Sequence, residues 1–247
     1  MSDLDLFWML LAGLGGGLAG SVAGLASLVS YPALLAVGVA PVAANVTNTV
    51  SLVFSGVGSV WGFRPELSDQ RSAVRRLAPV ALAGGLSGGV LLLVTPAGYF
   101  TKLVPVLIGA GSLAVLVPRR PIAADELRRA RLLFGGATYL VALYCGYFGA
   151  GAGVVLLALL MAGTGLSLVK CVALRNLLVG LANAVAAIAF AAFGPVHWLA
   201  MLPLAAGFLV GGRLGPIVVR KAPVWPLRVL ITCGGLGLAV HLGLSAY

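Results

Sequence analysis

Apolar runs of about 20 residues or more recur from one end of this sequence to the other. A helical run of that length matches the hydrocarbon thickness of a lipid bilayer. Charged residues make up only 9% of the chain, whereas soluble domains carry about 25%, so the runs are not the core of a large soluble protein. The sequence therefore predicts an all-α integral membrane protein, a polytopic helical bundle.

The apolar runs fall into two kinds. Single crossings are expected over 43–63, 77–95, 100–117, 168–193, 196–219 and 226–244. The glycine-rich runs 6–38 and 132–163 are too long for one crossing and too short for two with a turn, which need roughly 40 residues. Each of these two runs is predicted to form a broken, re-entrant pair of shortened helices. An opened backbone survives at membrane depth only where protein or water satisfies it.

Both halves of the chain follow one plan, a re-entrant pair and then three crossings. The predicted division is a first membrane repeat, a basic cytoplasmic linker and a second membrane repeat, over 1–117, 118–131 and 132–247. Placing Asn48 on Asn176 also brings Ser55 onto Asn183. A re-entrant pair adds no crossing, so each half crosses an odd number of times. The second repeat is therefore expected to be inverted relative to the first.

Basic residues cluster in short loops between the apolar runs and account for a net charge of +10. With inverted repeats, one side holds the basic segments 64–76 and 119–131, Lys170, and the group Arg220, Lys221 and Arg228, and the other side keeps only Lys102. Loops rich in Lys and Arg remain in the cytoplasm. We therefore expect a multi-pass protein of the bacterial inner membrane with cytoplasmic basic loops, and no binding of nucleic acid.

The acids are few and none lies inside a predicted crossing: they are Asp3, Asp5, Glu66, Asp69, Asp125 and Glu126. Cation carriers usually keep a carboxylate at membrane depth, so a cation substrate is not expected. Paired carboxylates for hydrolysis and acidic metal ligands are missing as well. The widely spaced cysteines Cys145, Cys171 and Cys233 are interpreted as small buried residues. The sequence predicts no catalytic residue, no metal and no cofactor.

Polar residues occupy the first turns of the predicted 43–63 helix, at Asn45, Thr47, Asn48 and Thr49. Lipid cannot hydrogen-bond amides and hydroxyls, so these side chains face protein, water or a ligand. Neutral donors at a helix N-terminus can seat an anion together with the exposed N–H groups and the helix dipole. Interhelical hydrogen bonds that hold the bundle together are the other interpretation, and both can hold.

Arg175 lies inside the predicted 168–193 helix, beside Asn176 and with Asn183 on the same face as that asparagine. An arginine in a membrane is costly unless it is solvated or paired. No acid is near in the sequence, so a bound anion is one fitting partner. The alternative is that Arg175 caps helix carbonyls or reaches the cytoplasmic surface. Arg213 is interpreted as a packing or loop-facing charge.

The sequence resembles the TauE/SafE sulfite exporter family of bacterial and archaeal transporters. The resemblance covers nearly the whole chain, and its motifs are Tyr31–Leu35, Pro41–Val50, Trp61–Arg64, Gly146–Gly153, Leu174–Leu178, Asn183 and Gly194–Trp198. Two positions depart from the family pattern. The first-half glycine cluster is Ala23–Ser27 here, and Arg175 often looks like lysine in the family. The resemblance implies transport of sulfite, a sulfonate or a related organosulfur anion.

The expected function is a permease for such an anion, working by alternating access between the repeats. An anion channel and a non-transporting membrane subunit are the alternatives. The expected partners are the small anionic substrate and the lipid bilayer, with a homo-oligomer left open. The substrate-binding residues are predicted to be Asn45, Thr47, Asn48, Thr49, Gly149, Gly151, Arg175, Asn176 and Asn183.

Overall fold

The computed structural model describes residues 1–114 and 127–221, together with residues 240 and 244. Over these residues the chain forms helices and no strand, which confirms the predicted all-α bundle. The first half contains α1 (Asp3–Ala23), α2 (Ala26–Ala36), α3 (Pro41–Gly62), α4 (Arg64–Ser68), α5 (Arg71–Val94) and α6 (Ala97–Ala114). The second half contains α7 (Leu127–Tyr147), α8 (Ala152–Thr164), α9 (Leu168–Phe193) and α10 (Trp198–Lys221). The predicted crossing at 226–244 lies almost wholly outside the described residues.

Among the described residues, four helices are long and apolar enough to cross a membrane, namely α1, α5, α9 and α10. The bounds of α9 are those predicted from the sequence, 168–193. Helix α3 has a comparable length of 22 residues, but its Asn, Thr and Ser side chains make it less apolar than these four. Those polar side chains are buried in the protein, so the helix does not need an apolar surface all round.

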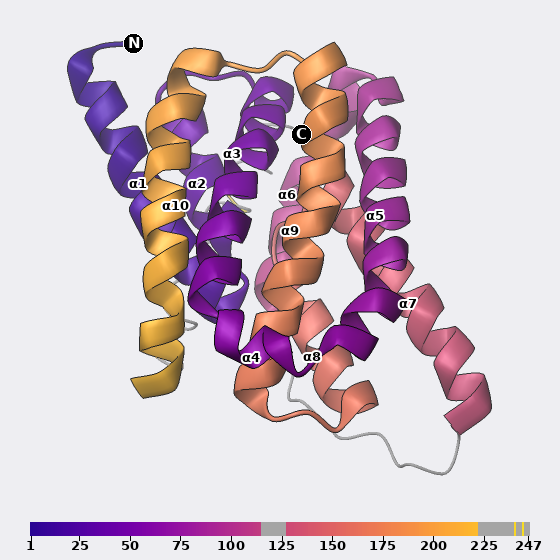
Figure 1. Cartoon of the computed structure of the whole chain (residues 1–247). Coiled ribbons are helices and arrows are strands. Elements are labelled where there is room, and N and C mark those ends of the chain that lie inside the picture. The colour runs from indigo at the N-terminus through magenta and orange to yellow at the C-terminus, as the bar shows by residue number, and fades with distance from the viewer. Residues whose placement is uncertain (115–126, 222–239, 241–243, 245–247) are drawn as a thin grey trace.

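The glycine-rich runs form two broken helix pairs, α1–α2 and α7–α8. In Figure 1, α1 descends from the top and α7 rises from the bottom, so the two pairs enter the bundle from opposite ends. The second helix of each pair is short, with 11 residues in α2 and 13 in α8. The expectation that both helices of a pair are shortened is wrong for α1, whose 21 residues are long and apolar enough to cross the membrane. Helix α7 also has 21 residues, but its apolar part is only Leu133–Tyr147. The backbone breaks at Gly24, whose φ of 80° ends α1 in a left-handed cap.

Helix α7 begins at Leu127, so the last residues of the predicted basic linker, 127–131, are helical. Arginine has a high helix propensity, and the helix therefore continues beyond its apolar part into the arginine-rich segment. The sequence prediction placed the start of this helix at residue 132 because the apolar run begins there, and an apolar run marks only the part of a helix that lies in lipid or against protein.

The helices pack in two groups that meet through α3 and α9. Helix α10 packs against α1 and α3, and α5 packs against α7 and α9 (Figure 1). Glycines allow these close approaches. A Cβ atom on Gly17 of α1 would lie 2.8 Å from the carbonyl oxygen of Phe208 in α10, and one on Gly56 of α3 would lie 3.1 Å from the Cα of Gly180 in α9.

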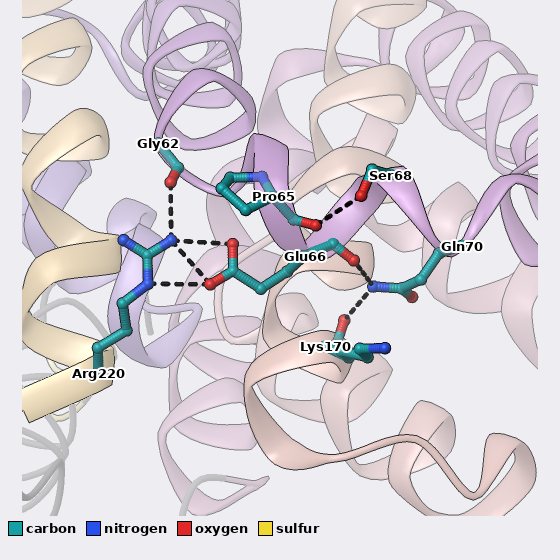
Figure 2. Close-up of polar contacts among 7 residues, drawn as sticks. All are labelled: Gly62, Pro65, Glu66, Ser68, Gln70, Lys170 and Arg220. Atoms are coloured by element: carbon teal, nitrogen blue, oxygen red, sulfur yellow. Dashed lines mark hydrogen bonds and ion pairs between the residues drawn. The ribbon is translucent and has the colours of Figure 1, made fainter.

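Polar residues around the short helix α4 tie the first half to the second at one end of the bundle (Figure 2). We call Glu66, Asp69, Gln70, Lys170 and Arg220 the α4 cluster. The guanidinium of Arg220 donates two hydrogen bonds of 2.9 Å to the carboxylate of Glu66. The Gln70 amide donates to the carbonyl oxygen of Lys170 at 3.1 Å, and the Lys170 ammonium lies 3.3 Å from the Asp69 carboxylate. The cluster therefore joins the α3–α5 connection to the start of α9 and the end of α10.

Candidate functional site

The breaks of the two helix pairs meet inside the bundle. A Cβ atom on Gly153, at the start of α8, would lie 2.7 Å from the Cα of Gly24, and one on Gly24 would lie 2.7 Å from the carbonyl carbon of Gly153. These distances are shorter than a real side chain tolerates. The two backbones are therefore in direct contact, which only glycine permits at both positions.

A cavity of about 50 Å³ lies at this contact. Residues of α1, α2, α3, α9 and the α7–α8 break line it: Gly20, Gly24, Ala26, Ser27, Leu52, Ser55, Gly56, Ser59, Cys145, Gly149, Gly153, Arg175, Asn176, Val179, Gly180 and Asn183. None of these lining residues is acidic. The lining combines one guanidinium, hydroxyls, carboxamides and bare glycine backbone, a set of groups suited to an anion.

Arg175 is buried, with 1% of its surface exposed. Its Nη2 donates to the carbonyl oxygens of Gly20 at 3.0 Å and Ser21 at 2.6 Å, and to Oδ1 of Asn176 at 2.8 Å. Those carbonyls belong to the last turn of α1, where carbonyls run out of helical N–H partners, although the Gly20 oxygen also accepts from the backbone N–H of Gly24 at 2.8 Å. A cation there also interacts favourably with the negative end of the helix dipole. The interpretation that Arg175 caps helix carbonyls is thus confirmed, and the same side chain also lines the cavity.

Asn176 and Asn183 both line the cavity but differ in their bonding. Asn176 donates from Nδ2 to the carbonyl oxygen of Ser21 at 3.0 Å, so it shares the capping of α1 with Arg175. Asn183 is 4% exposed and makes no hydrogen bond with another described residue. Its carboxamide therefore keeps two donors and one acceptor for a bound molecule.

Asn48 does not line the cavity but holds a residue that does. Its Nδ2 donates to Oγ of Ser27 at 3.1 Å, and its Oδ1 accepts from Oγ of Ser30 at 2.6 Å. Both serines belong to α2, so Asn48 fastens α2 to α3. Ser27 lines the cavity and uses its oxygen as the acceptor here, which leaves its own hydroxyl hydrogen to donate.

The other polar residues at the start of α3 bond to neighbouring backbone. Asn45 donates to the carbonyl oxygen of Tyr147 at 2.8 Å, and Thr49 donates to the carbonyl oxygen of Asn45 at 3.0 Å. The Thr47 hydroxyl accepts from the backbone N–H of His197 at 2.8 Å. The Asn45 bond joins α3 to α7 and the Thr47 bond joins α3 to the segment before α10, as the interhelical interpretation expects, whereas the Thr49 bond lies within α3. A direct role in substrate binding stays a prediction for these three residues.

The glycines predicted for the site divide in the same way. Gly149, with a φ of 76°, lines the cavity. Gly151, with a φ of 74°, is the N-cap of α8 and lies outside the lining. Its conformation reverses the chain after α7, which is a structural requirement.

Sequence reasoning missed the serines of α3. Ser55 and Ser59 line the cavity, and Ser59 bonds the Gly212 carbonyl oxygen at 3.4 Å, whereas Ser55 makes no hydrogen bond with a described residue. Together with Ser51 they recur every four residues, which places all three on one face of a helix. That spacing was visible in the sequence, but serine is also common in membrane helix packing.

The comparisons with known proteins agree on the class of protein. The family model of the sulfite exporter TauE/SafE matches residues 9–242. The probable membrane transporter protein YfcA of Escherichia coli K12 is 26% identical, over 91% of this chain and 89% of the relative. A probable membrane transporter protein of Haemophilus influenzae Rd is 28% identical, over 86% of this chain and 85% of the relative. The probable membrane transporter protein ORF9 of a Sinorhizobium species is 23% identical, over 98% and 95%. No solved structure gives a significant match.

Proposed function

Because the chain belongs to the sulfite exporter TauE/SafE family, and is therefore a multi-pass membrane transporter, we propose that it transports a small sulfur-containing anion such as sulfite or an organosulfonate. The observation that carries the proposal is the cavity at the Gly24–Gly153 contact. Its lining has one guanidinium and several hydrogen-bond donors and no carboxylate. The guanidinium and the donors offset the lost hydration and the charge of an anion, whereas the guanidinium repels a cation and no carboxylate of the lining balances it.

In the proposed binding mode, the substrate oxygens accept hydrogen bonds from Ser27, Ser55 and Asn183. The Ser55 and Asn183 side chains bond to no other described residue, so binding a substrate breaks no internal hydrogen bond of theirs. Arg175 supplies positive charge from a position already fixed by the α1 carbonyls. A guanidinium fixed in this way loses little further side-chain freedom when the anion arrives.

The size of the cavity bears on the substrate. A cavity that holds a single water molecule measures about 10–15 Å³ on the same scale, and this cavity measures about 50 Å³. It therefore has room for a compact anion such as sulfite.

Alternating access between two inverted repeats is the mechanism we propose. Equivalent glycine pairs support it. In α5, Gly84 contacts the backbone of α7 and Gly85 that of α9, while in α10, Gly211 contacts the backbone of α1 and Gly212 that of α3. If the repeats are related by inversion, α1 corresponds to α7, α3 to α9 and α10 to α5, and both sets of contacts are then the same interaction. Rocking one group of helices on the other would open the Gly24–Gly153 contact from either side.

The end of the bundle that carries the α4 cluster is proposed to face the cytoplasm of a bacterial cell with the protein in its inner membrane. Exposed bases gather there, among them Arg64, Arg71, Arg75, Arg76 and Lys221. Basic loops of membrane proteins remain on the cytoplasmic side.

Radiolabelled sulfite flux into proteoliposomes tests this function. We expect saturable flux that unlabelled sulfite competes away and that Asn183→Ala reduces. Thr101→Ala, on the exposed surface of α6, is the matched control and should transport normally. Flux that does not saturate and follows the membrane voltage would identify the alternative, an anion channel. Absence of flux with sulfite, thiosulfate, sulfoacetate and taurine alike, without any thermal shift, would overturn the proposal.

A further inference from the structure

A second hollow, separate from the transport cavity, opens on the outer surface between the end of α3 and α10. It has a volume of about 500 Å³ and shares no lining residue with the 50 Å³ cavity. We call it the α3–α10 groove. Its walls include Trp61 of α3, and Val210, Arg213, Leu214 and Ile217 of α10.

The walls of the groove are apolar and exposed. Trp61 is 55% exposed, Val210 and Ile217 are each 51% exposed, and Leu214 is 43% exposed. Because α10 is long and apolar enough to cross the membrane, side chains that protrude from it in this way lie against lipid. The groove is therefore a place where acyl chains contact the protein.

A positive charge lies in the same groove. The guanidinium carbon of Arg213 is 3.9 Å from the centre of the Trp61 ring, and Arg213 forms no ion pair with a described residue. Arg220 lies at the end of the groove, bonded to Glu66 and to the carbonyl oxygen of Gly62 (Figure 2). An arginine beside lipid is costly unless an anion or water accompanies it, and the ring contact alone provides no counter-charge.

We propose that the α3–α10 groove binds an acidic phospholipid. The lipid phosphate accepts hydrogen bonds from Arg213 near the membrane surface, where tryptophan rings of membrane proteins gather. One acyl chain lies along Val210, Leu214 and Ile217. A soluble phosphate would leave these apolar walls uncovered, and the amine of a zwitterionic headgroup would add a positive charge beside Arg213. The combination of cation and apolar wall fits an acidic lipid such as phosphatidylglycerol or cardiolipin.

The test compares lipids and variants by thermal denaturation of the delipidated full-length protein in detergent, without any transport substrate. We expect phosphatidylglycerol to raise the Tm of the native chain more than phosphatidylcholine does. Arg213→Gln should lose at least half of that difference, and Leu214→Gln should weaken it through the acyl chain. Arg76→Gln removes an equal charge from an exposed position of α5 and should retain the full difference.

Three results would overturn the proposal. The first is an equal response to phosphatidylglycerol and phosphatidylcholine. The second is an equal loss in Arg213→Gln and Arg76→Gln, which would indicate nonspecific attraction to a basic surface. The third is an equal stabilisation by glycerol phosphate, with Leu214→Gln unaffected, which would identify a soluble anion as the occupant. Native mass spectrometry of the same variants counts the lipids retained and provides an independent measurement.

Discussion

Gly24 and Gly153, from opposite halves of the chain, touch backbone to backbone beside the 50 Å³ cavity. The position of a Cβ atom on Gly153 is 2.7 Å from the Cα of Gly24. The contact joins the breaks of both helix pairs, so a movement of one pair relative to the other at this point changes it. A substitution at either glycine therefore alters the lining of the cavity.

Gly153→Ala should impair both stability and transport. The added methyl group meets backbone, which cannot rotate away, and overpacking of this kind costs about 1–3 kcal/mol. Gly136→Ala in α7 is the control, because a Cβ there has nothing within 4 Å and alanine favours helix by about 1 kcal/mol. The Tm in thermal denaturation and the sulfite flux should both fall for Gly153→Ala and stay unchanged for Gly136→Ala. Equal behaviour of the two variants would show that the backbone contact is loose.

Transport should depend on the shape of the side chain at position 175 as well as on its charge. Arg175→Ala removes the hydrogen bonds to Gly20, Ser21 and Asn176, and bonds from a charged group are worth roughly 1.5–3 kcal/mol each. We expect marked destabilisation and no transport. Arg175→Lys keeps the charge but not the planar fork, so it should retain partial flux with a raised KM. Unimpaired transport by Arg175→Ala, with unchanged affinity, would remove Arg175 from the binding site.

Substitutions of Ser55 and Asn48 should have different effects, the first on substrate binding and the second on stability. Ser55 makes no hydrogen bond with a described residue, so Ser55→Ala should keep the Tm and raise the KM for sulfite about fivefold, as expected for one lost hydrogen bond of about 1 kcal/mol. Asn48→Ala breaks the bonds to Ser27 and Ser30 and should lower the Tm first. If Ser55→Ala instead unfolds the protein and leaves the KM unchanged, its side chain is structural.

The helices were predictable from the sequence where apolar length decides the outcome. The 168–193 helix is the clearest case, because a single apolar run matches one crossing and ends before Gly194 and Pro195. The division of 6–38 was not predictable in the same way. The run is apolar throughout, and the break falls at Gly24 because that residue meets Gly153 in the other half, a contact that no local pattern contains.

The cavity was predictable in part. Arg175, Asn176 and Asn183 stood out because charged and amide groups are rare inside apolar helices, and the structure places all three in the lining. The sequence could not show which polar groups satisfy each other. Asn48 bonds two serines of α2, and Asn45 bonds the end of α7. Such pairings depend on tertiary contacts between helices far apart in the chain.

The α4 cluster offers a test of alternating access. The Glu66–Arg220 pair joins α4 to the end of α10 with two hydrogen bonds of 2.9 Å, so separating α4 from α10 breaks it. Glu66→Gln weakens the pair and should shift the population towards a form open at this end. The more exposed Asp69–Lys170 pair is worth about 0–1 kcal/mol, and Asp69→Asn is therefore the matched control.

The native thiol of Cys145 can report this opening, because Cys145 lines the cavity and is only 2% exposed. A small thiol reagent applied to proteoliposomes should label Cys145 faster in Glu66→Gln than in the native chain, and Asp69→Asn should change the rate little. Cys145→Ala identifies the labelling of other cysteines, which is subtracted. Weakening the pair by about 1 kcal/mol corresponds to roughly a fivefold change in the population of the open form, so the labelling rate should rise by a similar factor. Identical rates in the native chain and Glu66→Gln would mean that the α4 cluster holds the fold together but does not gate the cavity.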